Sequence, residues 1–145
     1  MNPGPLPAKR AFLHDLHNFP PGSKARFLGC VTNYDVQTGT LTLEHHYPHT
    51  TPKPATIPVD ITLLLESIKS SDLQVGAWLN VLGYVREKEK DKNNRTTSHR
   101  ASNASRESIY IEAVMVFPAG SFHIGEYERV LQDWIDVDRM VRGPG

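Results

Sequence analysis

Residues 75–85 read Val75-Gly76-Ala77-Trp78-Leu79-Asn80-Val81-Leu82-Gly83-Tyr84-Val85, and this apolar stretch has the composition of a β-strand. Before it, the chain carries a long strand-like stretch over Lys24–Val36, a short alternating strand, a third apolar run and a short helical segment. After it come a polar loop and a final strand over Ile109–Phe117. Five strands with one helix between the third and the fourth are typical of the oligonucleotide-binding (OB) barrel. The order of elements therefore predicts an all-β fold, a single five-stranded OB barrel with flanking helices.

The first two strands predict a meander. Apolar residues on both sides of Gly29 break strict alternation, as expected of a strand that bends sharply and changes faces within a barrel. The segment Asp35–Thr40 contains a Thr-Gly pair and predicts a hairpin turn. After it, Leu41, Leu43 and His45 alternate with polar residues, which is the pattern of a half-buried strand.

The third strand and the short helix follow a proline-rich loop. The run Ala55–Val59 contains Pro58, and because proline cannot donate a ladder hydrogen bond, an edge strand is expected. Asp60 is a plausible N-cap for a helix that ends near Ser71. The apolar residues at near-helical spacing within it are Leu63, Leu64, Leu65 and Ile68. This helix should plug the bottom of the barrel.

The 145 residues suffice for one domain and are too few for two ordinary ones. We expect a proline-rich N-terminal arm over residues 1–22, a barrel over 23–118 with a long polar loop at 88–107, and a C-terminal helix within 119–145. The apolar patch Phe12–Phe19 should pin the arm across the barrel, with residues 1–10 disordered.

The C-terminal helix should run from about His123 to Arg142, with Ser121 as a possible N-cap. One seam has a three-four spacing and consists of Tyr127, Val130, Trp134, Val137 and Val141, and the stripe is widened by Ile124, Leu131 and Ile135. A helix that only caps a small barrel needs a narrower stripe. The extra width predicts a second buried contact, with another molecule, whereas the alternative is a helix that lies lengthwise on its own barrel.

The charge pattern argues for weak or assisted binding of nucleic acid. Sixteen basic and sixteen acidic residues give a net charge of zero, whereas proteins that hold nucleic acid alone usually carry a basic excess. The candidates for base stacking are Tyr34 and Tyr47, and those for phosphate contact are Lys88, Lys90, Lys92 and Arg95. Each tyrosine is equally consistent with a structural role, and acidic residues interleave the lysines.

Catalysis, cofactors and metals find no support in the sequence. The seven histidines lack cysteines or carboxylates at the spacing of zinc ligands, and no nucleophile, paired-carboxylate or phosphate-cradling motif is present. The lone cysteine, Cys30, is interpreted as a small core residue. No apolar run approaches the length of a membrane span. We therefore expect a non-enzymatic protein without cofactor, metal or membrane partner.

Three segments resemble one protein family. Residues Pro21–Val31, Leu41–His45 and Gln74–Tyr84, combined with the Phe12-Leu13 arm and the long terminal helix, are similar to the fungal Ten-one subunit of the CST (Cdc-thirteen/Stn-one/Ten-one) telomere-capping complex. The resemblance extends from about Phe12 through the final helix. It implies a nuclear protein that pairs with the Stn-one protein, an OB protein, in a heterodimer similar to the two smaller subunits of replication protein A. It also implies a supporting role in binding single-stranded telomeric DNA and protecting chromosome ends.

The resemblance also implies site residues. Arg26 falls where the family tends to have a basic residue on the first strand, at the partner interface, and Tyr127, Trp134 and Arg139 are the corresponding helix residues. From the stripe we add Val130, Leu131 and Val137 to the predicted partner contacts. The polar loop is longer than in compact members. Two alternatives stay open: a barrel that binds single-stranded DNA or RNA by itself, and an adaptor of a replication or repair complex.

Overall fold

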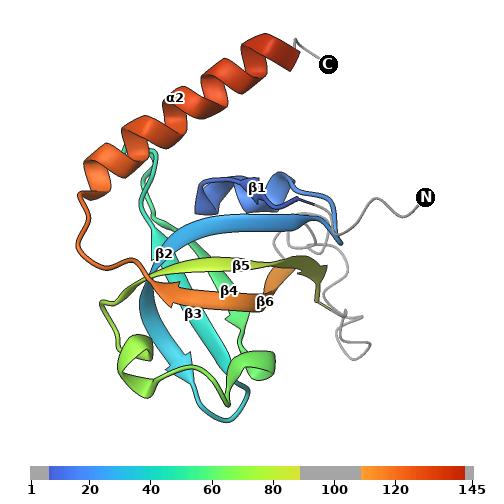
Figure 1. Ribbon diagram of the computed structural model, residues 1–145, viewed down its shortest axis with the longest axis vertical. Helices are drawn as coiled ribbons and strands as arrows, with labels where there is room; N and C mark the ends of the chain where they lie inside the picture. Colours follow the sequence, from blue (N-terminus) through green and yellow to red (C-terminus); the bar gives the residue numbers. More distant parts are fainter. Residues whose placement is uncertain (1–6, 89–108, 143–145) are drawn as a thin grey trace.

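The computed structural model describes residues 7–88 and 109–142 and places them in a closed β-barrel with a long C-terminal helix (Figure 1). The strands are β1 (Lys9–Arg10), β2 (Lys24–Asp35), β3 (Thr40–His45), β4 (Ala55–Asp60), β5 (Trp78–Glu87) and β6 (Ile109–Pro118). Three 3-10 turns, η1 (Leu13–Asn18), η2 (Thr62–Leu64) and η3 (Ser70–Leu73), precede the helix α2 (Ile124–Arg142). The predicted OB barrel, formed by β2 to β6, is confirmed.

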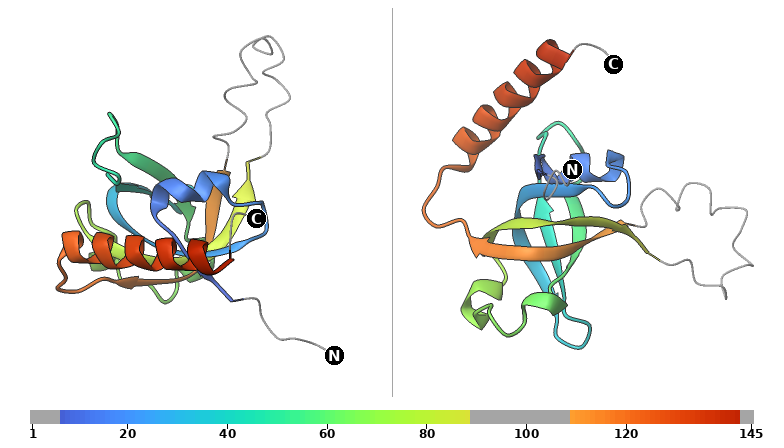
Figure 2. Two further views of the ribbon diagram at one scale, coloured as in Figure 1. Left: turned by 90° about the horizontal axis from the view of Figure 1, so that it is seen from above. Right: turned by 45° about the vertical axis from the view of Figure 1, so that its right-hand side comes forward.

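The barrel closes because β2 pairs with two other barrel strands, β3 and β5. Its first half, Lys24–Cys30, pairs with β5, and its second half, from Cys30 onward, pairs with β3. The change of partner occurs next to Gly29, where a Cβ atom would lie 2.8 Å from the Cβ of Leu43. The predicted bend therefore also requires glycine for space, because a larger residue would push β3 outward. The two further views in Figure 2 show the resulting barrel from above and in an oblique view.

Strand β4 differs from the predicted edge strand. Its full length pairs with β3, and its last two residues, Val59 and Asp60, also pair in parallel with β6. Pro58 lies just before this second pairing, so the missing N–H of proline is tolerated. The parallel contact between β4 and β6 is the step that completes the barrel wall.

The predicted helix between the third and fourth strands is present only as the two short turns η2 and η3. Asp60 does not cap an α-helix: the residue before η2 is Ile61, and the Asp60 carboxylate accepts a hydrogen bond from the Thr62 N–H at 2.8 Å. Consecutive leucines cannot all face one barrel, and Leu63 stays 67% exposed. The residues that pack on the core from this segment are Ile61, Leu64, Ile68 and Leu73. The segment therefore still covers the barrel end.

The N-terminal arm is part of the core. Phe12, Leu13 and Leu16 are all 1% exposed or less, as expected for an arm pinned across the barrel. The disorder expected for residues 1–10 is wrong at Lys9 and Arg10, which pair in parallel with the start of β2. Two residues are too few for a hydrophobic pattern, so this strand left no sequence signal.

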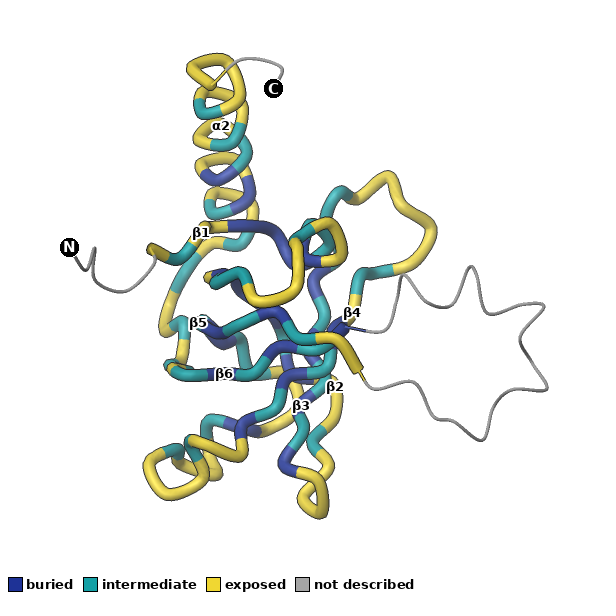
Figure 3. The backbone as a smooth tube through the Cα atoms, turned by 90° about the vertical axis from the view of Figure 1, so that its right-hand side faces the viewer, coloured by how far each residue is buried: buried dark blue, intermediate teal, exposed yellow. Residues whose placement is uncertain are grey.

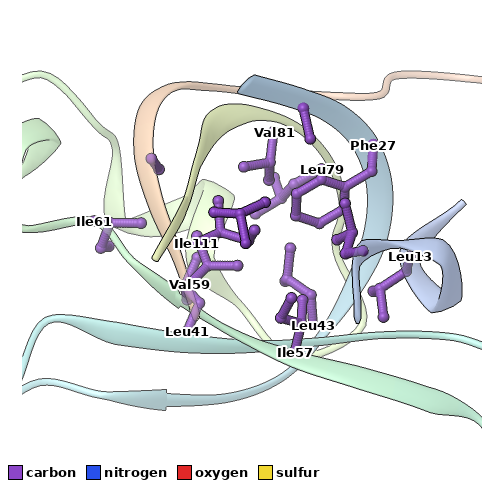
Figure 4. Close-up of a cluster of buried hydrophobic side chains, with 14 of the residues drawn as sticks. Leu13, Phe27, Leu41, Leu43, Ile57, Val59, Ile61, Leu79, Val81 and Ile111 are labelled. Carbon is purple, nitrogen blue, oxygen red and sulfur yellow. The ribbon is translucent and has the colours of Figure 1, made fainter. Parts of the chain in front are cut away.

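Apolar side chains from every strand of the barrel fill its interior (Figure 4). The labelled residues in that view are Leu13, Phe27, Leu41, Leu43, Ile57, Val59, Ile61, Leu79, Val81 and Ile111. Burial falls off sharply outside this cluster, and most of α2 is exposed (Figure 3). Among the described residues, no helix is long and apolar enough to cross a membrane.

The helix α2 begins one residue later than predicted. Its first backbone hydrogen bond runs from the N–H of Tyr127 to the carbonyl of His123, so His123 occupies the N-cap position and Ser121 lies outside the helix. The helix follows β6 and projects away from the barrel (Figures 1 and 3). The buried residues of α2, Glu128 and Leu131, both lie in its N-terminal half, and the C-terminal half is largely exposed.

Candidate partner interface

A largely exposed apolar stripe runs along α2. Val130, Trp134, Val137 and Val141 recur at helical spacing, and their exposed fractions are 57%, 46%, 59% and 81%. The neighbouring Met140 is 82% exposed. Leu131, which follows Val130 by one residue and so lies about 100° around the helix from it, is buried. The wide stripe predicted from the sequence is therefore divided, with one part packed within the chain and one part uncovered.

A groove of about 590 Å³ lies beside the stripe, between α2 and the strands β2 and β5. Five of the predicted partner residues line it, and the structure thus brings Arg26 of β2 next to residues of α2 that lie about 100 positions later in the sequence. The five are Arg26, Tyr127, Val130, Leu131 and Trp134. The Arg26 guanidinium is 5.7 Å from the centre of the Phe117 ring, which keeps the cation on the outer surface of the barrel. The groove has an apolar helix wall and a basic strand wall.

Two predicted partner residues have a different placement. Leu131 is 6% exposed, so its side chain already packs within the chain. Arg139 is exposed, but it follows Val130 by nine residues and is therefore about half a turn out of phase with the stripe. The structure places Val130 and Val137 on the stripe and leaves Arg139 on the far side of the helix.

A buried carboxylate, Glu128, attaches the N-terminal half of α2 to the barrel, and the sequence analysis did not predict it. Glu128 accepts hydrogen bonds from Nε2 of His45 at 2.8 Å and contacts Nε2 of His49 at 3.1 Å. One turn later, the Tyr47 hydroxyl donates to Oε1 of Gln132 at 3.0 Å. We call His45, Tyr47, His49, Glu128 and Gln132 the helix clamp. It joins the end of β3 and the following loop to α2.

An aromatic cluster completes the attachment of the helix. The Phe12 ring stacks on Tyr47 at 4.2 Å and meets the edge of Tyr127 at 6.4 Å. The arm, the loop after β3 and α2 therefore meet at one point. The sequence does contain a signal for this arrangement. Glu128 follows Ile124 by four residues and precedes Leu131 by three, so it lies on an apolar face of the helix. A charged residue at such a position indicates a buried polar partner.

Burial lowers the pKa of His45, and the hydrogen bond to Glu128 offsets this only in part. Within the described residues Nδ1 of His45 is buried without a hydrogen-bond partner, which fits a neutral ring whose Nε2–H donates to the carboxylate. Adding a proton would bury an unpaired N–H at Nδ1. His45 is therefore neutral in the folded chain at neutral pH.

A pH dependence of stability follows from this lowered pKa. Because the unfolded His45 titrates near pH 6.5, the unfolded chain binds more protons below that pH, and the free energy of unfolding should decrease as the pH falls from 7.5 to 5.5. One such group contributes at most about 1.4 kcal/mol per pH unit. Urea unfolding at both pH values should give a smaller decrease for His45→Gln than for the unmodified chain. The exposed control His17→Gln should keep the full decrease, and equal decreases in both variants would contradict the assignment.

The predicted nucleic-acid residues that the structure describes, Tyr34, Tyr47 and Lys88, are not gathered in one place. Tyr34 packs partly on the core, and the Tyr47 ring face is covered by Phe12. Lys88 is exposed and lines a cleft of about 410 Å³ with Tyr110, Asp35 and Asp60. Lys90, Lys92 and Arg95 lie outside the described residues. Two carboxylates beside Lys88 make this cleft a poor phosphate site by itself.

Neither a metal site nor a reactive thiol emerges from the geometry. In the described part of the chain, no group of three or more His, Cys, Asp or Glu side chains could hold a metal ion. Burial, and to a lesser extent Glu44, raise the pKa of Cys30, so its thiol stays protonated at neutral pH.

Solved structures with this fold include two from S. pombe. A chain of the crystal structure of the S. pombe Stn1-Ten1 complex matches with a TM-score of 0.63 and 21% identity, over 92% of this chain and 96% of that one. The S. pombe telomere capping protein Ten1 matches with a TM-score of 0.61 and 21% identity, over 90% and 99% of the two chains. The hypothetical protein ygiW from E. coli has a TM-score of 0.50 and 12% identity, over 77% and 91%. These likenesses establish the shared fold.

Sequence comparison identifies the family. A search of curated protein sequences gives no match. The family model for Ten1, described as the telomere-capping subunit of the CST complex, matches residues 1–132. This match includes the arm, the barrel and the first half of α2, and with it the helix clamp and most of the groove. The chain therefore belongs to the Ten1 family of telomere-capping CST complex subunits.

Proposed function

We propose that this chain is the Ten1-type subunit that pairs with an Stn1-type OB-fold protein at chromosome ends in the nucleus. The observation that carries the proposal is the uncovered stripe on α2 beside the groove that contains Arg26. The matching S. pombe structure is a complex of Stn1 and Ten1, which supports a partner of that type. Family membership supports the telomeric location.

The physical argument rests on burial. Val130, Trp134, Val137 and Val141 are all at least 46% exposed along one helix face, and contiguous apolar surface of this kind marks an interaction site. An apolar helix of the partner could lie along the stripe, with its side chains in the groove. Trp134 is the expected anchor, because tryptophan is enriched among the residues that dominate interface energy.

The helix clamp gives the interface its geometry. Because Glu128 and Gln132 are held by the loop after β3, the N-terminal half of α2 has a defined angle to the barrel before the partner arrives. Less ordering is then needed on binding, which favours affinity. The C-terminal end, with Met140 and Val141 more than 80% exposed, is free to adjust to the partner.

This chain contributes to DNA binding together with its partner. With zero net charge and two carboxylates in the cleft beside Lys88, the isolated chain should hold a single strand weakly. The heterodimer supplies a larger combined surface, and we propose that this chain supports single-stranded telomeric DNA binding and end protection only within it. The function is thus one of partner stabilisation and added affinity.

The experiment is salt-titrated binding of a labelled telomeric G-rich single strand to the purified chain, alone and with an Stn1-type partner. Weak binding alone that tightens markedly with the partner supports the proposal. Tight, sequence-tolerant binding by the isolated chain would instead assign it as an independent single-strand binder. Failure to form a heterodimer by size-exclusion chromatography would overturn the subunit assignment.

A further inference from the structure

The helix α2 is attached to the rest of the chain through side chains of its N-terminal half. Its buried residues are Glu128 and Leu131, and the helix clamp supplies three hydrogen bonds between α2 and the end of β3 with the loop that follows. The connection from β6 passes through Gly120 and Ser121, which are both exposed. Gly120 has a φ of +70°, in the region that favours glycine. The orientation of α2 therefore depends on its side-chain contacts more than on the connection.

The centre of the helix clamp is a buried carboxylate between two imidazole rings. Glu128 and His45 are 5% and 3% exposed, and Oε2 of Glu128 lies 2.8 Å from Nε2 of His45. The other carboxylate oxygen lies 3.1 Å from Nε2 of His49, whose side chain is 70% exposed. Of the two rings, His45 is enclosed and His49 is open to water.

A second proton on His45 meets no acceptor while α2 is in place. Nδ1 of His45 is buried without a hydrogen-bond partner among the described residues, and so is Nδ1 of His14. Burial disfavours the charged ring most, the hydrogen bond and charge of Glu128 favour it, and His49 and His14 oppose it. His14 itself pairs with Asp15 at 3.1 Å. The titratable side chains that face His45 are Glu128 and Tyr127 of α2, His14 of η1, and Tyr47 and His49 of the loop.

We propose that the helix clamp is a pH-sensitive switch that holds α2 in the partner-binding position at neutral pH and releases it at mildly acidic pH, a proposal that rests on the partner role argued above. When α2 moves away, water reaches both ring nitrogens of His45. The released form therefore accepts the second proton that the docked form excludes, and protons favour release.

The direction of the pH effect follows from the lowered pKa of His45 in the docked form. Docking is fully favoured above about pH 6.5, the ordinary value for a free histidine. Below that value the preference for the docked form falls by at most about tenfold per pH unit, until the docked ring also takes up a proton. The switch therefore operates below pH 6.5.

Release of α2 separates the two walls of the partner groove. Tyr127 and Trp134 belong to the helix wall, and Arg26 belongs to the strand wall. A partner that contacts both walls binds only the docked form, so its apparent affinity is reduced by the fraction of chains in which α2 is released. Proton uptake by His45 and partner binding are thus opposed to each other.

The first test measures partner affinity by isothermal titration calorimetry at pH 7.5 and pH 5.5. Between these values, the affinity of the unmodified chain should fall about 3- to 10-fold more than that of His45→Gln, because glutamine keeps an N–H donor for Glu128 and takes up no proton. The control is His17→Gln, an exposed histidine outside the helix clamp and the groove, which should behave as the unmodified chain. Any pH dependence of the partner itself is common to all three forms.

The second test follows the position of α2 without the partner. Fluorescent labels at Met140→Cys and Val36→Cys, two positions that are 82% and 75% exposed, report energy transfer between α2 and the far end of the barrel in a Cys30→Ser background. The transfer should change between pH 7.5 and pH 5.5 while the circular dichroism of the barrel is retained. Adding His45→Gln should remove the change.

The outcomes distinguish the switch from the proposed function. If the heterodimer forms at pH 7.5 but all three forms lose the same affinity at pH 5.5, or the energy transfer stays constant, the switch is wrong and the function stands. If no heterodimer forms at either pH, both are overturned. If the barrel unfolds together with the change in energy transfer, α2 is not released separately and the switch is wrong.

Discussion

Replacing Trp134 and Val137 together with alanine is expected to weaken binding of the Stn1-type partner by at least about 25-fold. Both side chains lie on the uncovered stripe and are 46% and 59% exposed, so the isolated chain loses little packing when they are removed. A buried tryptophan anchor at an interface is worth at least about 2 kcal/mol, and each 1.4 kcal/mol changes affinity tenfold. Isothermal titration calorimetry of both forms with the partner measures the change directly.

The control for this prediction is a pair of exposed apolar residues on another surface. Val36→Ala with Leu63→Ala removes side chains that are 75% and 67% exposed, and partner affinity should stay within about twofold. An unchanged affinity for the stripe variant would exclude the stripe as the interface. A large drop in its melting temperature would instead assign Trp134 and Val137 to the chain's own core. Tyr127 is a less informative choice, because its ring also contacts Phe12.

The barrel could be predicted because its signal is local and repeated. Alternation at Leu41, Leu43 and His45 and the Thr-Gly turn before them each depend on neighbours a few residues away, and all three side chains are buried in the structure. The same holds for the period of α2, which placed Val130 and Trp134 on one face. Arg139 was assigned by family resemblance instead of by phase, and the helical period places it away from the stripe.

The features that sequence reasoning missed depend on distant contacts. The helix clamp joins His45 to Glu128 across 83 residues, and neither residue has a local pattern that identifies its partner. The leucine run after Asp60 has a helical composition, but the short connection must place Ile61 and Leu73 on the core, and two 3-10 turns do so where an α-helix was expected. Tertiary packing overrides propensity at such positions.

Phe12→Ala is expected to lower the free energy of unfolding by about 3–5 kcal/mol, the typical loss for a buried phenylalanine. Phe12 is 1% exposed, and its ring stacks on Tyr47, which in turn donates to Gln132 of α2. A domain of this size has about 5–15 kcal/mol of total stability, so the loss is a large share. Urea unfolding monitored by circular dichroism measures it, provided that the denaturant slope is unchanged.

The arm offers its own matched control in Phe19, which is only partly buried and lies 5.5 Å from the Lys9 ammonium. Phe19→Ala should cost clearly less than Phe12→Ala, and Phe12→Leu should recover most of the loss because it restores apolar volume without the stacked ring. Equal, small losses for both alanine variants would mean that the arm is only loosely held.

Since Phe12 also supports Tyr47 and Tyr127, its removal should weaken partner binding as well. The arm would then act on the interface by setting the position of α2, although Arg10 is the only residue of its described part, from residue 7 onward, that lines the groove.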